Sequence, residues 1–251
     1  MKRILLIDIS NSFTKAAIAS GNRIGKVYRI PTSSLSATEL KKTFPPPRLD
    51  GVVLASVVPS QTPVVESAFS NVCQVGPGIN LGVGIDYPDP STIGADRLAN
   101  AAGCAAHYGF PAIVVDFGTA VTFDIISARG NYTGGVIAPG LEAMTNYLHS
   151  RTALLPNIRL SEPKSVVGRT TREAMLSGAV HGYRGLVREI LQKIRSEAFP
   201  RKRPYIIATG GDAELIGSRV MLFDSIDPLL TLKGLFAIGQ RNLPTLQPAR
   251  D

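Results

Sequence analysis

Two stretches of the chain place an acidic residue and small polar residues after a β-prone run. The first is Leu5–Lys15, where Asp8 ends an apolar run. The second is Ile113–Asp124, where Asp116 ends the run and a Gly-Thr pair follows. Backbone N–H groups and a hydroxyl at such a turn can hold an anion, and the neighbouring carboxylate can hold a cation. The sequence therefore predicts two β-hairpins whose turns bind charged groups.

One constant sequence offset relates the two stretches. A single acid at the end of a strand is usually structural, but two matching hairpins in one chain are hard to attribute to chance. The offset matches Asp8 with Asp116, Ser10 with Gly118, Asn11 with Thr119 and Thr14 with Thr122. We therefore expect two similar halves, each organised around one hairpin.

A third candidate segment lies between the hairpins. Tyr87 stands in a loop fixed by two prolines, and Gly94-Ala95-Asp96-Arg97 follows at the start of a predicted helix. The carboxylate of Asp96 could remove a proton, and the guanidinium of Arg97 could hold an anion. The helix dipole also favours an acid in the first turn, so a purely structural role stays open on these residues alone.

The other predicted elements position these residues. Expected strands in the first half span residues 2–9, 13–19, 23–30 and 51–58, and expected helices span 34–43, 62–69 and 94–107. The second half adds a glycine-rich strand from 132, helices at 141–148 and from Thr170-Thr171 to 194, a strand from 205, an edge strand at 222–225 and a helix at 229–241. Their order is not that of a dinucleotide-binding fold.

Composition and charge limit the classes of function. The 251 residues, 44% hydrophobic and 18% charged, suit a globular chain with a sizeable core. Apolar runs are too short to span a bilayer, and Asp8 interrupts the N-terminal run too early for a signal peptide. Cys73 and Cys104 form no zinc motif and suit reduced thiols. We expect a cytoplasmic protein with no membrane segment.

The net charge of +8 raises the question of nucleic acid. The densest basic clusters, Lys41-Lys42 and Arg201-Lys202-Arg203, are not interleaved with aromatic residues. Nucleic acid is therefore disfavoured as the main partner, whereas a positive field suits small anionic substrates such as nucleotides.

A late glycine pair adds a possible nucleotide contact. Gly210-Gly211 follows a predicted strand and precedes a predicted helix, which suits close approach of a nucleotide or a plain strand–helix turn. No GxxxxGK[ST] loop and no protein-kinase pattern is present. Two acid-tipped hairpins with a late Gly-Gly turn resemble the superfamily of acetate and sugar kinases, Hsp70 and actin. That resemblance implies an α/β fold of two ribonuclease-H-like lobes, 1–111 and 112–251, with mixed sheets and an interlobe nucleotide cleft.

Four motifs narrow the resemblance to type III pantothenate kinase. They are Gly94-Ala95-Asp96-Arg97, Asp116-Phe117-Gly118-Thr119-Ala120, Gly134-Gly135-Val136-Ile137-Ala138-Pro139-Gly140 and Thr209-Gly210-Gly211-Asp212. The resemblance implies ATP-dependent phosphorylation of pantothenate to 4′-phosphopantothenate, the first step of coenzyme A biosynthesis. It also implies Mg²⁺ with the ATP, a monovalent cation (K⁺ or NH₄⁺), and a homodimer with substrate near the subunit interface.

The resemblance also assigns roles to individual residues. Asp96 matches the general base, and pantothenate contacts match Tyr87, Gly94, Ala95, Asp96, Arg97 and Thr171. ATP contacts match Asp8, Ile9, Ser10, Asn11, Ser12, Phe13, Thr14, Lys15 and Thr119, together with Gly210 and Gly211 of the late turn. Asp116 matches the ligand of the monovalent cation.

One departure keeps a second class of function open. The family's first hairpin has a glycine where this chain has Ser10. If that position needed a left-handed backbone, serine would cost about 1–2 kcal/mol, and its side chain could also crowd a phosphate. A non-catalytic regulatory or binding relative, similar to Bvg accessory factor, is the alternative. The presence of Asp8, Asp96 and Asp116 favours catalysis, and the Tyr87–Arg97 segment disfavours another small-molecule kinase.

Overall fold

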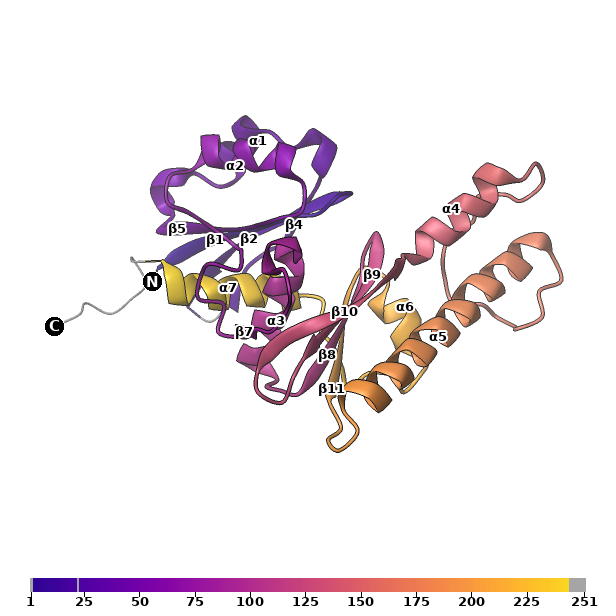
Figure 1. The fold of residues 1–251 in the computed structure, drawn as a ribbon. Coiled ribbons are helices and arrows are strands. Elements are labelled where there is room, and N and C mark those ends of the chain that lie inside the picture. Colours follow the sequence, from indigo (N-terminus) through magenta and orange to yellow (C-terminus); the bar gives the residue numbers. More distant parts are fainter. Residues whose placement is uncertain (1, 22, 244–251) are drawn as a thin grey trace. The chain divides into compact units, whose positions relative to one another are not determined.

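A computed structural model of the chain describes residues 2–21 and 23–243. The chain forms two compact units (Figure 1). Of the described residues, unit 1 takes 2–21, 23–109, the short segment 130–133 and 229–243, and unit 2 takes 110–129 and 134–228. The units differ from the predicted lobes 1–111 and 112–251 mainly in the last helix, which packs in unit 1.

Unit 1 is built on a mixed sheet with the strand order β3-β2-β1-β5-β6, and β4 also pairs with β2. Its strands are β1 (Arg3–Ile9), β2 (Phe13–Ser20), β3 (Arg23–Ile24), β4 (Tyr28–Pro31), β5 (Gly51–Ser56) and β6 (Val72–Gln74). The strand β1 runs antiparallel to β2 and parallel to β5. The single strand predicted over 23–30 is therefore divided into β3 and β4, which pair with different parts of β2.

Helices cover both faces of the sheet in unit 1. The helices α1 (Ala37–Thr43) and α2 (Thr62–Ala68) pack on one face, where Leu40 and Val65 contact the apolar side chains of β1 and β5. The helices α3 (Ala95–His107) and α7 (Leu230–Asn242) pack against each other and against β5 and β1. They cross so closely that a Cβ at Gly234 would clash with the carbonyl of Ala99.

Unit 2 has a second mixed sheet with the order β12-β11-β8-β9-β10. Its strands are β8 (Ala112–Phe117), β9 (Ala120–Ile126), β10 (Asn131–Pro139), β11 (Tyr205–Gly210) and β12 (Ser225–Ile226). The strand β7 (Gly84–Ile85) pairs with Asn131 and Tyr132, the part of β10 that belongs to unit 1. The edge strand predicted at 222–225 is shorter and lies at β12.

The helices of unit 2 are α4 (Leu141–Arg151), α5 (Thr171–Ala198) and α6 (Ala213–Gly217). The predicted capping box at the start of α5 is present, because Thr170 Oγ1 accepts from the N–H of Glu173 and the Glu173 carboxylate accepts from that of Thr170. The predicted stripe on α5 is buried against the sheet; it consists of Val180, Tyr183, Val187, Leu191 and Ile194. No helix within residues 2–21 and 23–243 is both long and apolar enough to cross a bilayer.

The two sheets repeat one strand pattern, which agrees with the predicted similarity of the halves. In each, the first strand of the unit is flanked by an antiparallel hairpin partner and by a parallel strand that arrives after a helix. The constant offset fails within the hairpins, however. Asp116 lies opposite Thr122, but Asp8 lies opposite Lys15 and not Thr14. The first turn is one residue longer than the second, so the match of Thr14 with Thr122 is wrong.

Candidate active site

The first hairpin places a buried carboxylate beside a polar turn. Asp8 is buried near the end of β1, and Ser10 Oγ donates to its Oδ1 at 3.4 Å. The Ser10 carbonyl accepts from Thr32 Oγ1 at 2.7 Å, and the Ser10 N–H donates to the Phe13 carbonyl at 3.3 Å. Ser10 is not among the positive-φ residues of the described chain, so this position needs no left-handed backbone. Ser10 therefore carries no strain from a left-handed backbone. Whether its side chain crowds a bound phosphate is tested by the replacement Ser10→Gly.

The helix that carries Asp96 begins at the same edge of the sheet as this hairpin. The parallel strands β1 and β5 end side by side, with Ile9 opposite Ser56, and the Val57 N–H donates to the Ile9 carbonyl at 3.0 Å. A Cβ built at Gly94 would lie 3.5 Å from Val57 Cγ1. Unit 1 thus brings the predicted phosphate hairpin and the predicted substrate helix to one sheet edge.

The start of α3 holds the Asp96 carboxylate in a defined position. Asp96 Oδ1 accepts from the N–H of Arg97 at 2.8 Å, and both side chains are half-buried. A Cβ at Gly94 would lie 2.6 Å from the same oxygen, so a side chain there would displace the carboxylate from this position. Gly94 thus leaves room for the Asp96 carboxylate where the Arg97 N–H holds it. Such an acid, fixed at a helix start, can accept a proton from a hydroxyl.

Tyr132 joins this group although sequence reasoning assigned it no role. The Tyr87 and Tyr132 rings meet edge to face with centroids 6.1 Å apart, and Arg97 Cζ lies 5.7 Å from the Tyr132 centroid. Tyr132 is 1% exposed, whereas Tyr87 is 37% exposed. The one signal in the sequence was an aromatic residue just before Gly134-Gly135 in the glycine-rich strand.

Unit 2 brings the second hairpin and the late glycine turn together. A Cβ at Gly210, where φ is +91°, would clash with the Phe117 backbone and lie 2.6 Å from Asp116 Oδ1. The Gly211 N–H donates to the Phe117 carbonyl at 2.8 Å. The turn of the hairpin also supports α4, because the Gly140 N–H donates to the Thr119 carbonyl at 3.1 Å. Asp116, Thr119 and Gly210-Gly211 therefore form one compact group.

Oxygen atoms near Asp116 suit a cation. Thr209 lies opposite Asp116 in the β8–β11 ladder, and its buried Oγ1 has no hydrogen-bond partner within the described chain. A buried hydroxyl is seldom left unbonded, so a bound ligand atom there would satisfy it. No group of three or more His, Cys, Asp or Glu residues that could hold a metal occurs in the described ranges, so Asp116 would need hydroxyl, carbonyl or ligand oxygens as well.

The carboxyl group of Asp212, next to the glycine turn, is electrostatically strained. Burial raises the pKa of Asp212, and the negative charge of Glu142 at the start of α4 raises it further. The hydroxyl of nearby Tyr183 donates to the Pro139 carbonyl at 3.0 Å. An environment that disfavours a carboxylate in this way is typical of a site that binds a cation or charged ligand.

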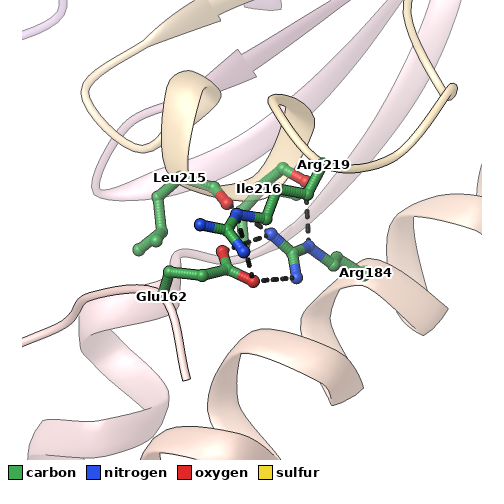
Figure 2. Close-up of polar contacts among 5 residues, drawn as sticks. All are labelled: Glu162, Arg184, Leu215, Ile216 and Arg219. Carbon is green, nitrogen blue, oxygen red and sulfur yellow. Dashed lines mark hydrogen bonds and ion pairs between the residues drawn. The ribbon is translucent and has the colours of Figure 1, made fainter. Parts of the chain in front are cut away.

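Thr171 lies at the first position of α5, after a long connection that lacks regular structure. Polar side chains of α5 hold this connection: Arg172 Nη1 donates to the Asn157 carbonyl at 2.9 Å, and Ser177 Oγ donates to the Val166 carbonyl. Arg184, further along α5, binds Glu162 of the connection through two hydrogen bonds of 3.0 and 2.7 Å. Figure 2 shows Arg184 between Glu162 and the carbonyls of α6.

The predicted site residues thus fall into separate groups. Unit 1 holds the first hairpin, Asp8 to Lys15, with Tyr87 and Gly94 to Arg97. Unit 2 holds the group of Asp116, Thr119 and Gly210-Gly211 at the sheet, and Thr171 at the start of α5. The role of each residue in binding stays a prediction.

Similarity to known proteins points in one direction. The sequence matches the family model of type III pantothenate kinase over residues 4–193. A type III pantothenate kinase of Akkermansia muciniphila is 49% identical over 241 residues, which cover 95% of this chain and 99% of that protein. These are the matches expected from the four sequence motifs.

Solved structures support the fold. A Baf family transcriptional activator from Campylobacter jejuni has a TM-score of 0.61 and 19% identity, covering 95% of this chain and 98% of its own. A 2-dehydro-3-deoxygalactonokinase from Sinorhizobium meliloti has a TM-score of 0.58 and 12% identity, and the match covers 96% of this chain and 99% of that one. At these identities the likeness concerns the fold alone. It confirms the predicted α/β fold of the sugar-kinase and actin superfamily, and the regulatory alternative gains no support from it.

Proposed function

Because the chain belongs to the type III pantothenate kinase family, we propose that it transfers the γ-phosphoryl group of ATP to the 4′-hydroxyl of pantothenate. The product is 4′-phosphopantothenate, and the reaction is the first step of coenzyme A biosynthesis. The observation that carries the proposal is the Asp96 carboxylate, fixed by the Arg97 N–H at the sheet edge where the Asp8 hairpin also ends.

Asp96 is the general base. Its carboxylate takes the proton from the 4′-hydroxyl as that oxygen forms a bond to the γ-phosphorus, and the bond to the ADP oxygen breaks. General-base assistance of this kind is worth about 10²–10⁴ in rate. The neighbouring Arg97 guanidinium holds the carboxylate of pantothenate, and Tyr87, Gly94, Ala95 and Thr171 complete the substrate contacts.

Phosphoryl transfer depends chiefly on positioning and charge neutralisation. We assign the ATP phosphates to the first hairpin, from Asp8 to Lys15, and to Thr119; we assign the adenosine side to Gly210-Gly211. Mg²⁺ bound to ATP would neutralise phosphate charge, with Asp8 as the buried carboxylate nearest the turn. A monovalent cation, K⁺ or NH₄⁺, would bind at Asp116, and the unbonded Thr209 hydroxyl in register with it supports this assignment.

We propose that the active form is a homodimer that pairs through the α4 arm, which we define as α4 and the connection up to α5. In Figure 1, α4 and the start of α5 extend beyond the sheet of unit 2. Only Leu141 and Thr145 of α4 are buried, and large apolar side chains are exposed on the arm. They are Met144, Tyr147, Leu148, Leu154, Val166 and Val167. Such a surface favours a partner of the same kind, and Thr171 follows directly after it.

A cytoplasmic location is part of the proposal. Cys73 and Cys104 are both free thiols in the structure, and burial raises the pKa of Cys104 to about 12, which keeps it unreactive. Both observations suit a reducing compartment that supplies ATP.

The direct test is ATP-dependent phosphorylation of pantothenate, with and without K⁺, by the wild type and by Asp96→Asn. We expect K⁺-dependent product in the wild type and at least a 100-fold lower kcat in the variant, with binding of both substrates retained. Glu66→Gln, a change at an exposed carboxylate of α2, is the control. A folded dimer that forms no product with any monovalent cation would overturn the kinase assignment.

A further inference from the structure

Tyr132 joins the two ends of the predicted pantothenate segment. Tyr87 lies in the proline-fixed loop and Arg97 in the first turn of α3, ten positions further along the chain. Both contact the ring of Tyr132, Tyr87 by its edge-to-face geometry and Arg97 by its position 5.7 Å from the ring centroid. One buried ring therefore touches both side chains that would face the substrate.

The backbone around Tyr132 fixes the same segment. Asn131 and Tyr132 pair in parallel with Gly84 and Ile85 of β7, and the Asp86 N–H donates to the Tyr132 carbonyl at 2.9 Å. A Cβ at Gly84 would clash with the end of the Asn131 side chain, so Gly84 leaves room for that side chain where β7 pairs with β10. The loop that carries Tyr87 thus begins directly at the Tyr132 backbone.

The chemistry of the ring suits this position. The face of a tyrosine ring attracts a guanidinium, and the attraction is stronger when water is excluded. Tyr132 is 1% exposed and Arg97 is half-buried, so the contact is largely shielded. An arginine that rests on a ring keeps its donors directed away from it, where a planar carboxylate can accept them.

We propose that Tyr132 is a positioning residue that sets the orientation of Arg97 and Tyr87 and thereby the recognition of the pantothenate carboxylate. The inference rests on the proposed function, because it takes Arg97 as the group that holds that carboxylate. In this proposal Tyr132 takes no part in proton transfer, which is assigned to Asp96.

Steady-state kinetics of Tyr132→Leu test this role. We expect the KM for pantothenate to rise roughly 10-fold, the KM for ATP to stay within about twofold, and kcat to fall less than the pantothenate KM rises. Tyr132→Phe keeps the ring and should stay close to wild type. A loss of packing alone would lower the active fraction and leave both KM values unchanged.

A neutral substrate sharpens the test. An N-alkyl amide of pantothenate lacks the carboxylate. Tyr132→Leu should therefore raise the KM for the amide by a clearly smaller factor than the KM for pantothenate. The inference would be overturned if Tyr132→Leu raised the KM for both substrates by the same factor, or left the KM for pantothenate unchanged. Tyr132→Met, which removes the ring but has a flexible side chain that can adapt to the space left behind, replaces Tyr132→Leu if that variant does not fold.

The failure of the inference and the failure of the proposed function are distinguishable. A wild type that phosphorylates neither pantothenate nor the amide contradicts the function. Calorimetric titration of pantothenate into wild type, Tyr132→Leu and Tyr132→Phe then still decides the role of the ring, because it needs no turnover. Weaker binding in Tyr132→Leu alone supports the inference, and equal binding in all three proteins contradicts it.

Discussion

Arg184 binds Glu162 with one side of its guanidinium and the end of α6 with the other. Nη1 and Nη2 donate to the Glu162 carboxylate, while Nη2 and Nε also donate to the carbonyls of Leu215 and Ile216 at 2.8 and 3.1 Å. One buried side chain therefore fastens the connection that leads to Thr171 and the helix that follows Gly210-Gly211 (Figure 2). Two predicted binding elements of unit 2 depend on it.

Removal of this arginine should destabilise the protein strongly. In Arg184→Met the two carbonyls lose their donors and Glu162 loses its main cationic partner, so we expect the free energy of unfolding to fall by about 3 kcal/mol. Glu162→Gln should cost less, about 1–2 kcal/mol. Urea denaturation measures both. Arg219→Gln is the matched control, because Arg219 is mostly exposed and its Nε lies 3.9 Å from Glu162 Oε1. If Arg219→Gln lowered the free energy of unfolding as much as Arg184→Met, the role assigned to Arg184 would be contradicted.

The same pair predicts a dependence of stability on pH. The hydrogen bonds from Arg184 hold the pKa of Glu162 below its usual value of 4.5. A lowered carboxyl pKa stabilises the folded protein above pH 4.5, and this contribution is lost as the pH falls through the folded-state pKa. The stability difference between wild type and Glu162→Gln should therefore be constant near neutral pH and shrink below about pH 4.5. A difference that grows on acidification would contradict the pairing.

Neutralisation of Asp212 should stabilise the protein without ligands. Because burial and Glu142 raise the pKa of Asp212, its ionisation costs the folded state free energy once the pH exceeds the unfolded-state value of 3.8. We expect Asp212→Asn to have a higher Tm than wild type at pH 7 and to lose this advantage as the pH falls toward 3.8. Glu214→Gln, at an exposed acid in α6, the helix that Asp212 precedes, is the control and should leave Tm nearly unchanged.

The replacement Ser10→Gly separates crowding of a phosphate from backbone strain. Ser10 has no left-handed backbone, so glycine relieves no strain and should lower the free energy of unfolding by about 0.5–1 kcal/mol through its greater freedom in the unfolded chain. The KM for ATP should fall, by at most about tenfold. If the ATP KM of Ser10→Gly equals that of the wild type, the serine does not crowd the nucleotide.

Charge on the α4 arm should dissociate the dimer. Tyr147 and Leu148 are exposed and adjacent, so Leu148→Glu in a Tyr147→Ser background would bury a carboxylate at the proposed interface. We expect a monomer by sedimentation velocity and a loss of pantothenate phosphorylation. Asn146→Glu lies on another side of α4 and should remain dimeric. A fully active monomer would contradict the placement of the substrate near the interface.

Local sequence determined most of the elements and the family. Apolar runs that end in Asp8 and Asp116 gave the two hairpins, because a strand end followed by small polar residues has few alternatives. The capping residues Thr170 and Glu173 marked the start of α5, because they satisfy N–H groups within one turn. The motif Gly94-Ala95-Asp96-Arg97 was informative because it matches the family's motif, and in the structure Gly94 lies close to the Asp96 carboxylate.

Only the tertiary structure decided which distant residues meet. The register of the first hairpin depends on a turn one residue longer than its counterpart, and strand periodicity does not reveal that length. The last helix joins unit 1 because its small residues allow close packing on α3, a contact with no local signal. The contacts of Tyr132 with Arg97 and of Arg184 with Glu162 likewise join residues on different elements. Chain topology brings them together, and pattern along the chain encodes only the elements that carry them.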